Sequence, residues 1–81
     1  MPQTLSLHDY MTGVEILYFY GMTFGLAKAT IERRSQELLS LMDLQSVRDR
    51  QIKSWSIGQQ RRISLACSML HSPKLLILYG T

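Results

Sequence analysis

Residues 56–79 read SIGQQRRISLACSMLHSPKLLILY, and this stretch decides the fold. Ser56 and Gln59 fit a capping box, in which each side chain hydrogen-bonds the backbone amide of the other residue. Four apolar or small residues then recur at the spacing of one helical face: Ile63, Ala66, Cys67 and Leu70. The stretch therefore predicts a helix that opens at Ser56 and runs to about His71, before Pro73 stops it.

The apolar run LLILY at residues 75–79 is continuous, which is typical of a strand buried on both faces of a parallel sheet. Such a strand needs neighbouring strands to satisfy its backbone groups, and no other segment of the sequence supplies a convincing one. The sequence thus predicts a mainly α structure with one C-terminal β-strand that belongs to a larger α/β fold.

A helix is also expected to start at Thr12, because Thr12 and Glu15 form a second capping box before an apolar and aromatic segment. Gly21 and Gly25 weaken this helix, so we expect it to stop near Gly25 or Leu26.

Residues 29–44 have the pattern of an amphipathic helix. The residues expected to face inward are Ile31, Leu38, Leu41 and Met42, and those expected to face outward are Glu32, Arg33, Gln36 and Glu37. Residues 45–54 are polar and lack a sustained period, so we expect a loop with solvated charges that can include one helical turn.

Composition excludes several classes of protein. The sequence has 81 residues, so it can form at most one small domain or part of a larger one. A single cysteine, Cys67, excludes an internal disulfide and a multi-cysteine zinc site. The uncharged residues 16–27 are too few for a membrane span, and the first residues do not resemble a signal peptide, so a cytosolic location is expected.

Residues 55–66 closely resemble the signature motif L-S-G-G-Q-Q-R-R-V-S-L-A of the ATP-binding cassette (ABC) ATPases. In that family the motif leads through a helix and an H-x-P-K turn into the Walker B strand L-L-I-L-D-E-P-T, which residues 70–78 resemble. Upstream, residues 1–3 resemble the Q-loop, and residues 12–21 resemble the family helix T-V-R-E-x-L-Y-F-Y-G. The resemblance is nearest to transporters of the A, G and H types.

The resemblance implies that residues 1–81 are a partial ABC ATP-binding domain, the helical subdomain of a P-loop NTPase-type α/β fold with one strand. The implied parts are the Q-loop region at 1–11, the helical subdomain at 12–55, the signature motif and its helix at 56–71, and a Walker B-like strand at 75–79. The phosphate-loop pattern G-x-x-x-x-G-K-[ST] occurs nowhere in the 81 residues.

The resemblance also implies roles for single residues. Ser56, Gly58 and Gln59 would contact ATP that the phosphate loop of a second ATP-binding domain holds. Gln3 would be the Q-loop glutamine, which reaches magnesium and the attacking water and relays to the membrane domains. A helix N-terminus suits a phosphate because free amides and the positive end of the helix dipole meet the anion. A plain capped helix is the alternative explanation of the same residues.

Three residues depart from the family pattern. Ile57 replaces the first signature glycine, and its stiff β-branched side chain is expected to weaken phosphate contact. Tyr79 and Gly80 replace the Walker B aspartate and the catalytic glutamate, and neither supplies a magnesium ligand or a base at neutral pH. We therefore expect no catalytic residue, no metal site, and no tight binding of ATP or magnesium by this chain alone.

The sequence thus indicates part of an ABC transporter ATP-binding domain, whose intact relatives couple ATP binding and hydrolysis to transport. They do so at the cytosolic face of a membrane, with a second ATP-binding domain and transmembrane domains as partners. Members of the family are ATPases, but this chain lacks the Walker B aspartate and the catalytic glutamate. ATPase activity of this chain is therefore uncertain from the sequence. The alternative is a small helical protein-interaction module without nucleotide chemistry.

Other side chains receive structural interpretations. Arg61 and Arg62 could contact nucleic acid, but two arginines at the start of an amphipathic helix more often form a solvated face, so no nucleic-acid partner is expected. His8 and His71 have no second ligand at metal spacing. Cys67 is expected to be an inert core residue, and the aromatic residues 18–20 to pack within the subdomain rather than to stack on a ligand.

Overall fold

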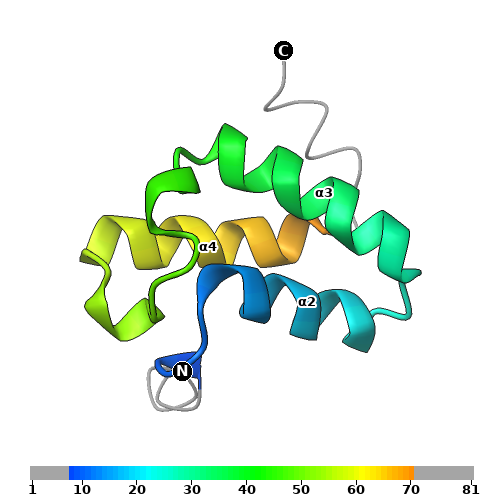
Figure 1. Ribbon diagram of the computed structural model, residues 1–81, viewed down its shortest axis with the longest axis horizontal. Helices are drawn as coiled ribbons and strands as arrows, with labels where there is room; N and C mark the ends of the chain where they lie inside the picture. The colour runs from blue at the N-terminus through cyan, green and yellow to red at the C-terminus, as the bar shows by residue number, and fades with distance from the viewer. Residues whose placement is uncertain (1–7, 71–81) are drawn as a thin grey trace.

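Three α-helices make up most of residues 8–70, the part of the chain that this computed structural model describes (Figure 1). They are α2 (Gly13–Thr23), α3 (Lys28–Leu41) and α4 (Ile57–Met69), with the 3-10 turns η2 (Gln45–Val47) and η3 (Ile52–Ser54) between α3 and α4. Helices α2 and α4 run in one direction, and α3 runs against both (Figure 1).

The predicted mainly α class is confirmed. Within residues 8–70 the β-structure is limited to an isolated antiparallel bridge between Thr12 and Gln51. The strand predicted at 75–79 lies outside the described residues. None of the helices in the described range combines the length and the apolar character that crossing a bilayer requires.

Helix α2 begins where the sequence predicts. The Glu15 amide donates to Thr12 Oγ1 at 3.1 Å, and the Thr12 amide donates to Glu15 Oε1 at 2.9 Å. The helix ends at Thr23, and Gly25 follows with a φ of 79°, a left-handed conformation that glycine adopts without steric cost. Its amide returns to the Met22 carbonyl at 3.0 Å, so Gly25 closes the helix as predicted.

Helix α3 stops at Leu41, short of the predicted end near Leu44. The cause is Asp43, whose φ of 58° turns the chain back on itself. The Leu44 amide then donates to the Leu39 carbonyl at 2.8 Å, and the Leu44 side chain becomes fully buried. The end of α3 is therefore a left-handed closing turn formed without a glycine.

The predicted faces of α3 are largely confirmed. The predicted outward residues are all at least partly exposed, and Ile31, Leu38 and Met42 are buried. Leu41 is only partly buried, whereas Ser35 and Leu39, which the sequence pattern did not select, are buried. The buried face of α3 is thus wider than the sequence predicts.

Residues 45–54 form two 3-10 turns, where the sequence predicts a loop that can include one helical turn. Their charged side chains are at least partly exposed, as expected, and the Arg48 guanidinium donates to Gln36 Oε1 at 3.0 Å. Ile52 enters the core from the same segment. The segment is ordered because Ile52 is buried in the hydrophobic core and Val47 packs against that core.

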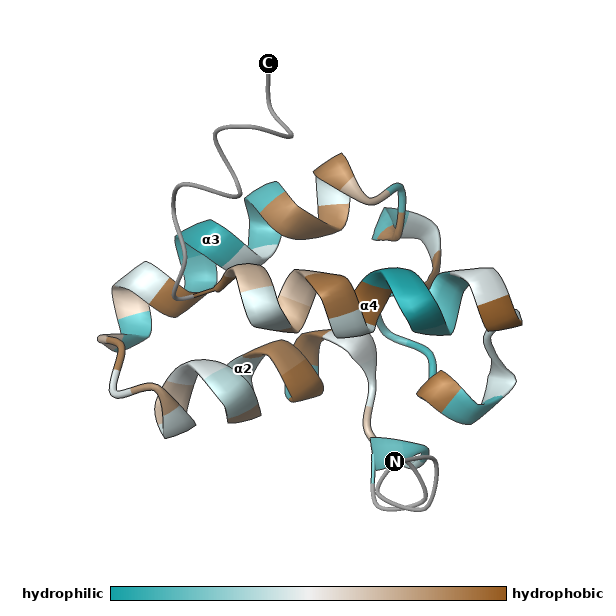
Figure 2. Cartoon of the chain, turned by 180° about the vertical axis from the view of Figure 1, so that it is seen from behind, coloured by the Kyte–Doolittle hydropathy of each residue, from teal (hydrophilic) through white to brown (hydrophobic). Residues whose placement is uncertain are grey.

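The core lies between the three helices. The largest fully buried side chains come from all of them and from the segment after α3: Leu17, Ile31, Leu38, Leu39, Leu44, Ile63, Met69 and Leu70. In Figure 2 a hydrophilic turn in the first half of α4 gives way to a more apolar second half. The buried residues of α4 are Ile63, Ala66, Cys67 and Met69. The predicted inward face of α4 is confirmed.

Two glycines allow close packing. A Cβ at Gly21 would lie 2.6 Å from Ile31 Cγ1, so α2 and α3 meet there without room for a methyl group. A Cβ at Gly13 would lie 2.7 Å from Trp55 Cη2. Helix α2 continues past Gly21, so the expected weakening of the helix does not end it, and the glycine serves packing instead.

Gly13→Ala and Gly21→Ala should each lower the free energy of unfolding by about 1–3 kcal/mol, because the added methyl overlaps a buried side chain. Gly58→Ala is the matched control. A methyl there would meet no atom closer than 3.6 Å, so this variant should be neutral or gain up to about 1 kcal/mol. Urea unfolding followed by circular dichroism measures all three. Equal stability of the three variants would contradict the packing argument.

Candidate functional site

The N-terminus of α4 is a closed capping box, as predicted. The Gln59 amide donates to Ser56 Oγ at 3.1 Å, and the Ser56 amide donates to Gln59 Oε1 at 3.0 Å. Ser56 has the extended backbone of an N-cap residue, with φ −66° and ψ 161°. The structure thus brings Ser56, Gly58 and Gln59 into one turn.

This turn presents hydrogen-bond donors to its surroundings. Ile57 and Gly58 occupy the first two helical positions, where a backbone amide has no acceptor within the helix. Ser56 Oγ accepts from Gln59 and keeps its own proton for donation. Ser56, Ile57 and Gly58 are all exposed, and the positive end of the helix dipole lies at the same point.

The packing of the described residues does not require glycine at position 58. The nearest atoms to an added methyl group would be Arg62 Nη1 at 3.6 Å and Ser56 Oγ at 4.0 Å, both ordinary contacts. Ile57 is also unconstrained, with 68% of its surface exposed. The two positions are therefore open to contact from another molecule.

Gln3, the other predicted site residue, lies outside the described residues, as do His71, Tyr79 and Gly80. Within residues 8–70 no group of three His, Cys, Asp or Glu side chains could hold a metal ion.

Arg62 anchors the first turns of α4 to the end of α3, and the prediction that it lies on a solvated face is wrong. Its Nε donates to the Met42 carbonyl at 3.0 Å, at the C-terminal end of α3. Arg34 on α3 donates in turn to the Leu70 carbonyl at the end of α4. Arg61 is exposed as expected. Two adjacent arginines in the sequence do not reveal that the Met42 carbonyl of another helix will lie within reach of Arg62, so the sequence could not predict this bond.

Trp55 and Gln60 also support the site, and the sequence pattern predicted neither role. Trp55 is 6% exposed, and its Nε1 donates to the Arg50 carbonyl at 3.1 Å. The Gln60 side chain donates to the carbonyls of Ile52 and Trp55. A tryptophan within a polar segment, directly before a capping box, was the signal that could have indicated the first of these contacts.

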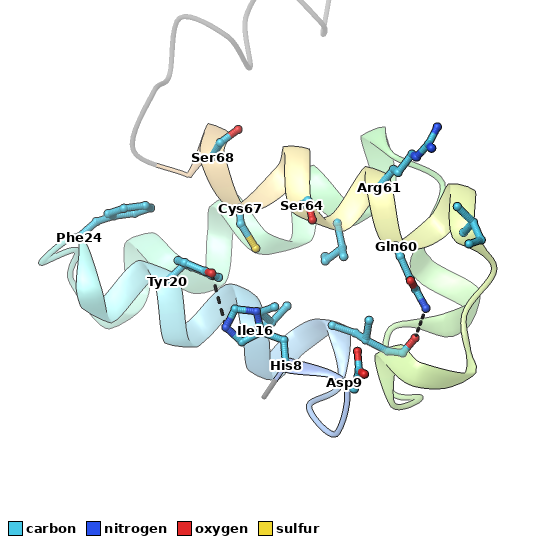
Figure 3. Close-up of a pocket in the computed structure, with 13 residues that line it drawn as sticks. His8, Asp9, Ile16, Tyr20, Phe24, Gln60, Arg61, Ser64, Cys67 and Ser68 are labelled. Atoms are coloured by element: carbon cyan, nitrogen blue, oxygen red, sulfur yellow. Dashed lines mark hydrogen bonds between the residues drawn. The ribbon is translucent and has the colours of Figure 1, made fainter. Parts of the chain in front are cut away.

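A groove of about 590 Å³ runs between α2 and α4 and ends at the same N-terminal turn (Figure 3). Its walls are mainly apolar, with Ile16 and Tyr20 on α2 and Ile63 and Cys67 on α4. Ile57 lies at the end nearest the capping box. The groove is therefore an apolar surface that continues to the donors of the turn.

The aromatic residues of α2 only partly pack as expected. The Tyr20 ring packs against the core, and its hydroxyl lies 3.5 Å from His8 Nε2 (Figure 3). Phe19 is 43% exposed and forms an edge-on contact with Tyr20.

Cys67 is buried in the core as predicted, and burial raises the pKa of its thiol to about 12. Burial also raises the pKa of the Tyr20 hydroxyl, with a further contribution from the neighbouring Cys67. Both side chains therefore stay neutral near pH 7, one on the α2 wall of the groove and one on the α4 wall.

Known proteins resemble the chain over almost its whole length. Residues 1–78 match the family described as ABC transporter. ABC transporter G family member 20 of Dictyostelium discoideum is 38% identical over 95% of this chain and 10% of its own length. The linearmycin resistance ATP-binding protein LnrL of Bacillus subtilis is 32% identical over 96% of this chain and 25% of its own length. The Nod factor export ATP-binding protein I of Sinorhizobium fredii is 37% identical over 96% and 23%.

The chain therefore spans about a tenth to a quarter of the length of these curated relatives. No solved structure matches it.

The stability of the fold should fall as pH rises from about 9 to about 12, because of Cys67. In this window the unfolded chain, with a thiol pKa near 9.0, ionises while the folded chain, with a pKa of about 12, does not. Ionisation then favours the unfolded state by up to about 1.4 kcal/mol per pH unit, and below pH 9 the contribution is fully present. Urea unfolding across the window measures the slope, and Cys67→Ala should remove this part of it. Parallel slopes in both proteins would contradict the assignment.

Proposed function

The chain belongs to the ABC transporter family, and we propose that residues 56–59 are its signature motif, the surface that contacts ATP held by a second ATP-binding domain. The observation that carries this proposal is the exposed N-terminal turn of α4. There the Ser56 hydroxyl and the amides of Ile57 and Gly58 are available as donors beside the positive end of the helix dipole. The γ-phosphate of ATP is an anion of matching chemistry.

Each residue of the turn has its own part in this proposal. Ser56 donates its hydroxyl proton to a phosphate oxygen. Gly58 offers its amide with no side chain in the way. Gln59 holds the Ser56 amide through its side chain and so keeps the turn in shape. A hydrogen bond to a charged phosphate contributes about 1.5–3 kcal/mol, so two such contacts would decide whether the nucleotide is held.

The Ile57 side chain hinders contact between the N-terminal turn of α4 and a phosphate group. Its side chain is 68% exposed at the same end of the helix, so it occupies space that a phosphate group would need. The proposed site is therefore a weakened form of the family's motif, with the donors in place and an apolar side chain beside them.

The rest of the chain is assigned in the same way. We propose that residues 1–11 are the Q-loop region with Gln3 as its glutamine, that 12–55 are the helical subdomain, and that 56–71 and 75–79 are the signature helix and the Walker B-like strand. Helices α2 and α3 fall within 12–55, and α4 falls within 56–71, which supports these divisions. We propose the A, G and H types as its nearest relatives, and two relatives named as ABC transporter G family members support the G type.

The chain corresponds to part of an ABC ATP-binding domain, and the activity of the whole protein is proposed from its relatives. Relatives named for Nod factor export and for linearmycin resistance favour a role in export. The proposed partners are a second ATP-binding domain and transmembrane domains. ATP and magnesium are the family's cofactors; magnesium would supply charge neutralisation at the phosphates, and the described residues contain no set of ligands for it.

A second candidate function is docking of a protein partner without nucleotide chemistry. The observation that favours it is the apolar groove between α2 and α4. Binding of a transmembrane domain or another ATP-binding domain that is equally strong with and without ATP would support this function over the first.

The isolated chain should bind Mg–ATP weakly or not at all and should show no hydrolysis above background. Its sequence contains no phosphate loop, and Tyr79 and Gly80 supply neither the metal carboxylate nor the base. Isothermal titration calorimetry and a phosphate-release assay measure both quantities. Magnesium-dependent ATP hydrolysis that co-purifies with the chain over successive chromatography steps would overturn this expectation.

Grafting residues 55–66 into a competent ABC ATP-binding domain should lower ATP-driven dimerisation and turnover by about one to four powers of ten, because Ile57 blocks one or two phosphate contacts. Ile57→Gly in the graft should restore much of both, since the glycine costs the helix at most about 1 kcal/mol.

Arg61→Gly in the same graft is the matched control. Arg61 is exposed on the same helix, so this change weakens the helix without clearing the phosphate path and should restore neither property. If the graft works equally well with isoleucine or glycine at position 57, the steric argument is wrong.

A further inference from the structure

We infer that Gln60 is a positioning residue: its side-chain amide ties the N-terminal turn of α4 to the segment 51–55, which is itself hydrogen-bonded to residues 9–11. The importance of that turn rests on the proposed function, but the link itself is a property of this chain. Through the Gln60 side chain and residues 51–55, residues 9–11 are connected by hydrogen bonds to the turn at Ser56–Gly58.

The first part of the link is the Gln60 side chain. Its Nε2 donates to the Ile52 carbonyl at 3.0 Å, shown in Figure 3, and to the Trp55 carbonyl at 3.3 Å. A primary amide has two N–H groups, and here each has an acceptor. Both bonds are partly buried, so water competes with them less than at an open surface.

The backbone of Gln60 binds the cap. Its amide donates to the Ser56 carbonyl at 2.9 Å, the bond that closes the first turn of α4. One residue therefore holds the capping turn through its main chain and η3 through its side chain. If η3 moves, the Gln60 side chain passes the displacement to the first turn of the helix.

The second part of the link joins η3 to the N-terminal segment. The Ile52 amide donates to the Met11 carbonyl at 2.9 Å, and the Lys53 amide donates to the Asp9 carbonyl at 2.9 Å. The Gln51 side chain donates to the Tyr10 carbonyl at 3.1 Å. Residues 9–11 are thus hydrogen-bonded to η3 and to its N-cap Gln51, the same turn that Gln60 holds.

The consequence is a connection between two parts of the proposed site. Residues 1–11 are proposed as the Q-loop region and 56–59 as the signature motif. A shift of residues 9–11 would reach Ser56 and Gly58 through bonds that this chain contains. The donors that face a phosphate would then move with residues 9–11 rather than independently of them.

Nuclear magnetic resonance of the full 81-residue chain, without nucleotide, tests the link. Gln60→Glu keeps the shape of the side chain but leaves only acceptors opposite two carbonyls. It should speed amide hydrogen exchange at Ile52 and Lys53 about tenfold or more and shift the amide resonances of residues 56–59. Gln60→Arg, which restores paired N–H donors, should return both properties toward those of the native chain.

Two controls separate positioning from general loss of structure. Arg61→Ala removes an exposed neighbour on α4 and should change neither property. The amide of Leu38 in the core should keep its exchange rate in Gln60→Glu. If Gln60→Glu leaves Ile52, Lys53 and residues 56–59 unchanged, or if Gln60→Arg behaves like Gln60→Glu, the inference is overturned.

Should Gln60→Glu unfold the chain, Gln51→Ala tests the link from its other end. This change removes the bond to Tyr10 and should shift the side-chain amide resonances of Gln60. Unchanged Gln60 resonances would refute the link. Because ATP takes no part in these measurements, their outcome is independent of the graft experiment, which alone tests phosphate contact.

Discussion

The contact of the Trp55 ring with Gly13 is the constraint on which the rest of the structure depends. A methyl group at position 13 would lie 2.7 Å from the indole, so α2 can start there only because that residue has no side chain. The indole Nε1 also donates to the Arg50 carbonyl, and the Val14 amide donates to the Arg48 carbonyl at 3.2 Å. The start of α2 and the segment at residues 48–50 therefore meet beside one ring. Because the tryptophan directly precedes the N-cap of α4, this contact also holds the N-terminal end of that helix against the start of α2.

Helices α3 and α4 hold each other's ends. Arg62 on α4 donates to a carbonyl at the end of α3, and Arg34 on α3 donates to the Leu70 carbonyl at the end of α4. A cation at a helix C-terminus interacts favourably with the negative end of the dipole, and the exchange satisfies carbonyls that have no partner within their own helix. The arrangement requires the helices to run in opposite directions, as they do (Figure 1). Each of the two C-terminal ends is thereby fixed by a side chain of the other helix.

The features that the sequence predicts correctly are those whose determining contacts are local. The capping boxes of Thr12 and Ser56 depend on residues three positions apart, so their patterns predicted both helix starts and the geometry of the candidate site. The predictions fail where distant residues decide the outcome. The left-handed turn at Asp43 places Leu44 in a core to which other helices contribute, and no local pattern specifies that core. The carbonyl partners of Gln60 and Arg62 come from segments whose position no spacing rule specifies.

The short connection between α2 and α3, closed by the left-handed Gly25, bears on how the chain folds. Neighbouring antiparallel helices joined by a few residues form contacts that are close in sequence, and such contacts close small loops at little entropic cost. Helix α4 is separated from α3 by the longer segment with its two 3-10 turns. We therefore expect the α2–α3 hairpin to act as the folding nucleus and α4 to dock onto it afterwards. The N-terminal turn of α4, with the donors of Ser56, Ile57 and Gly58, would then form late on the folding pathway, when Trp55 packs against Gly13.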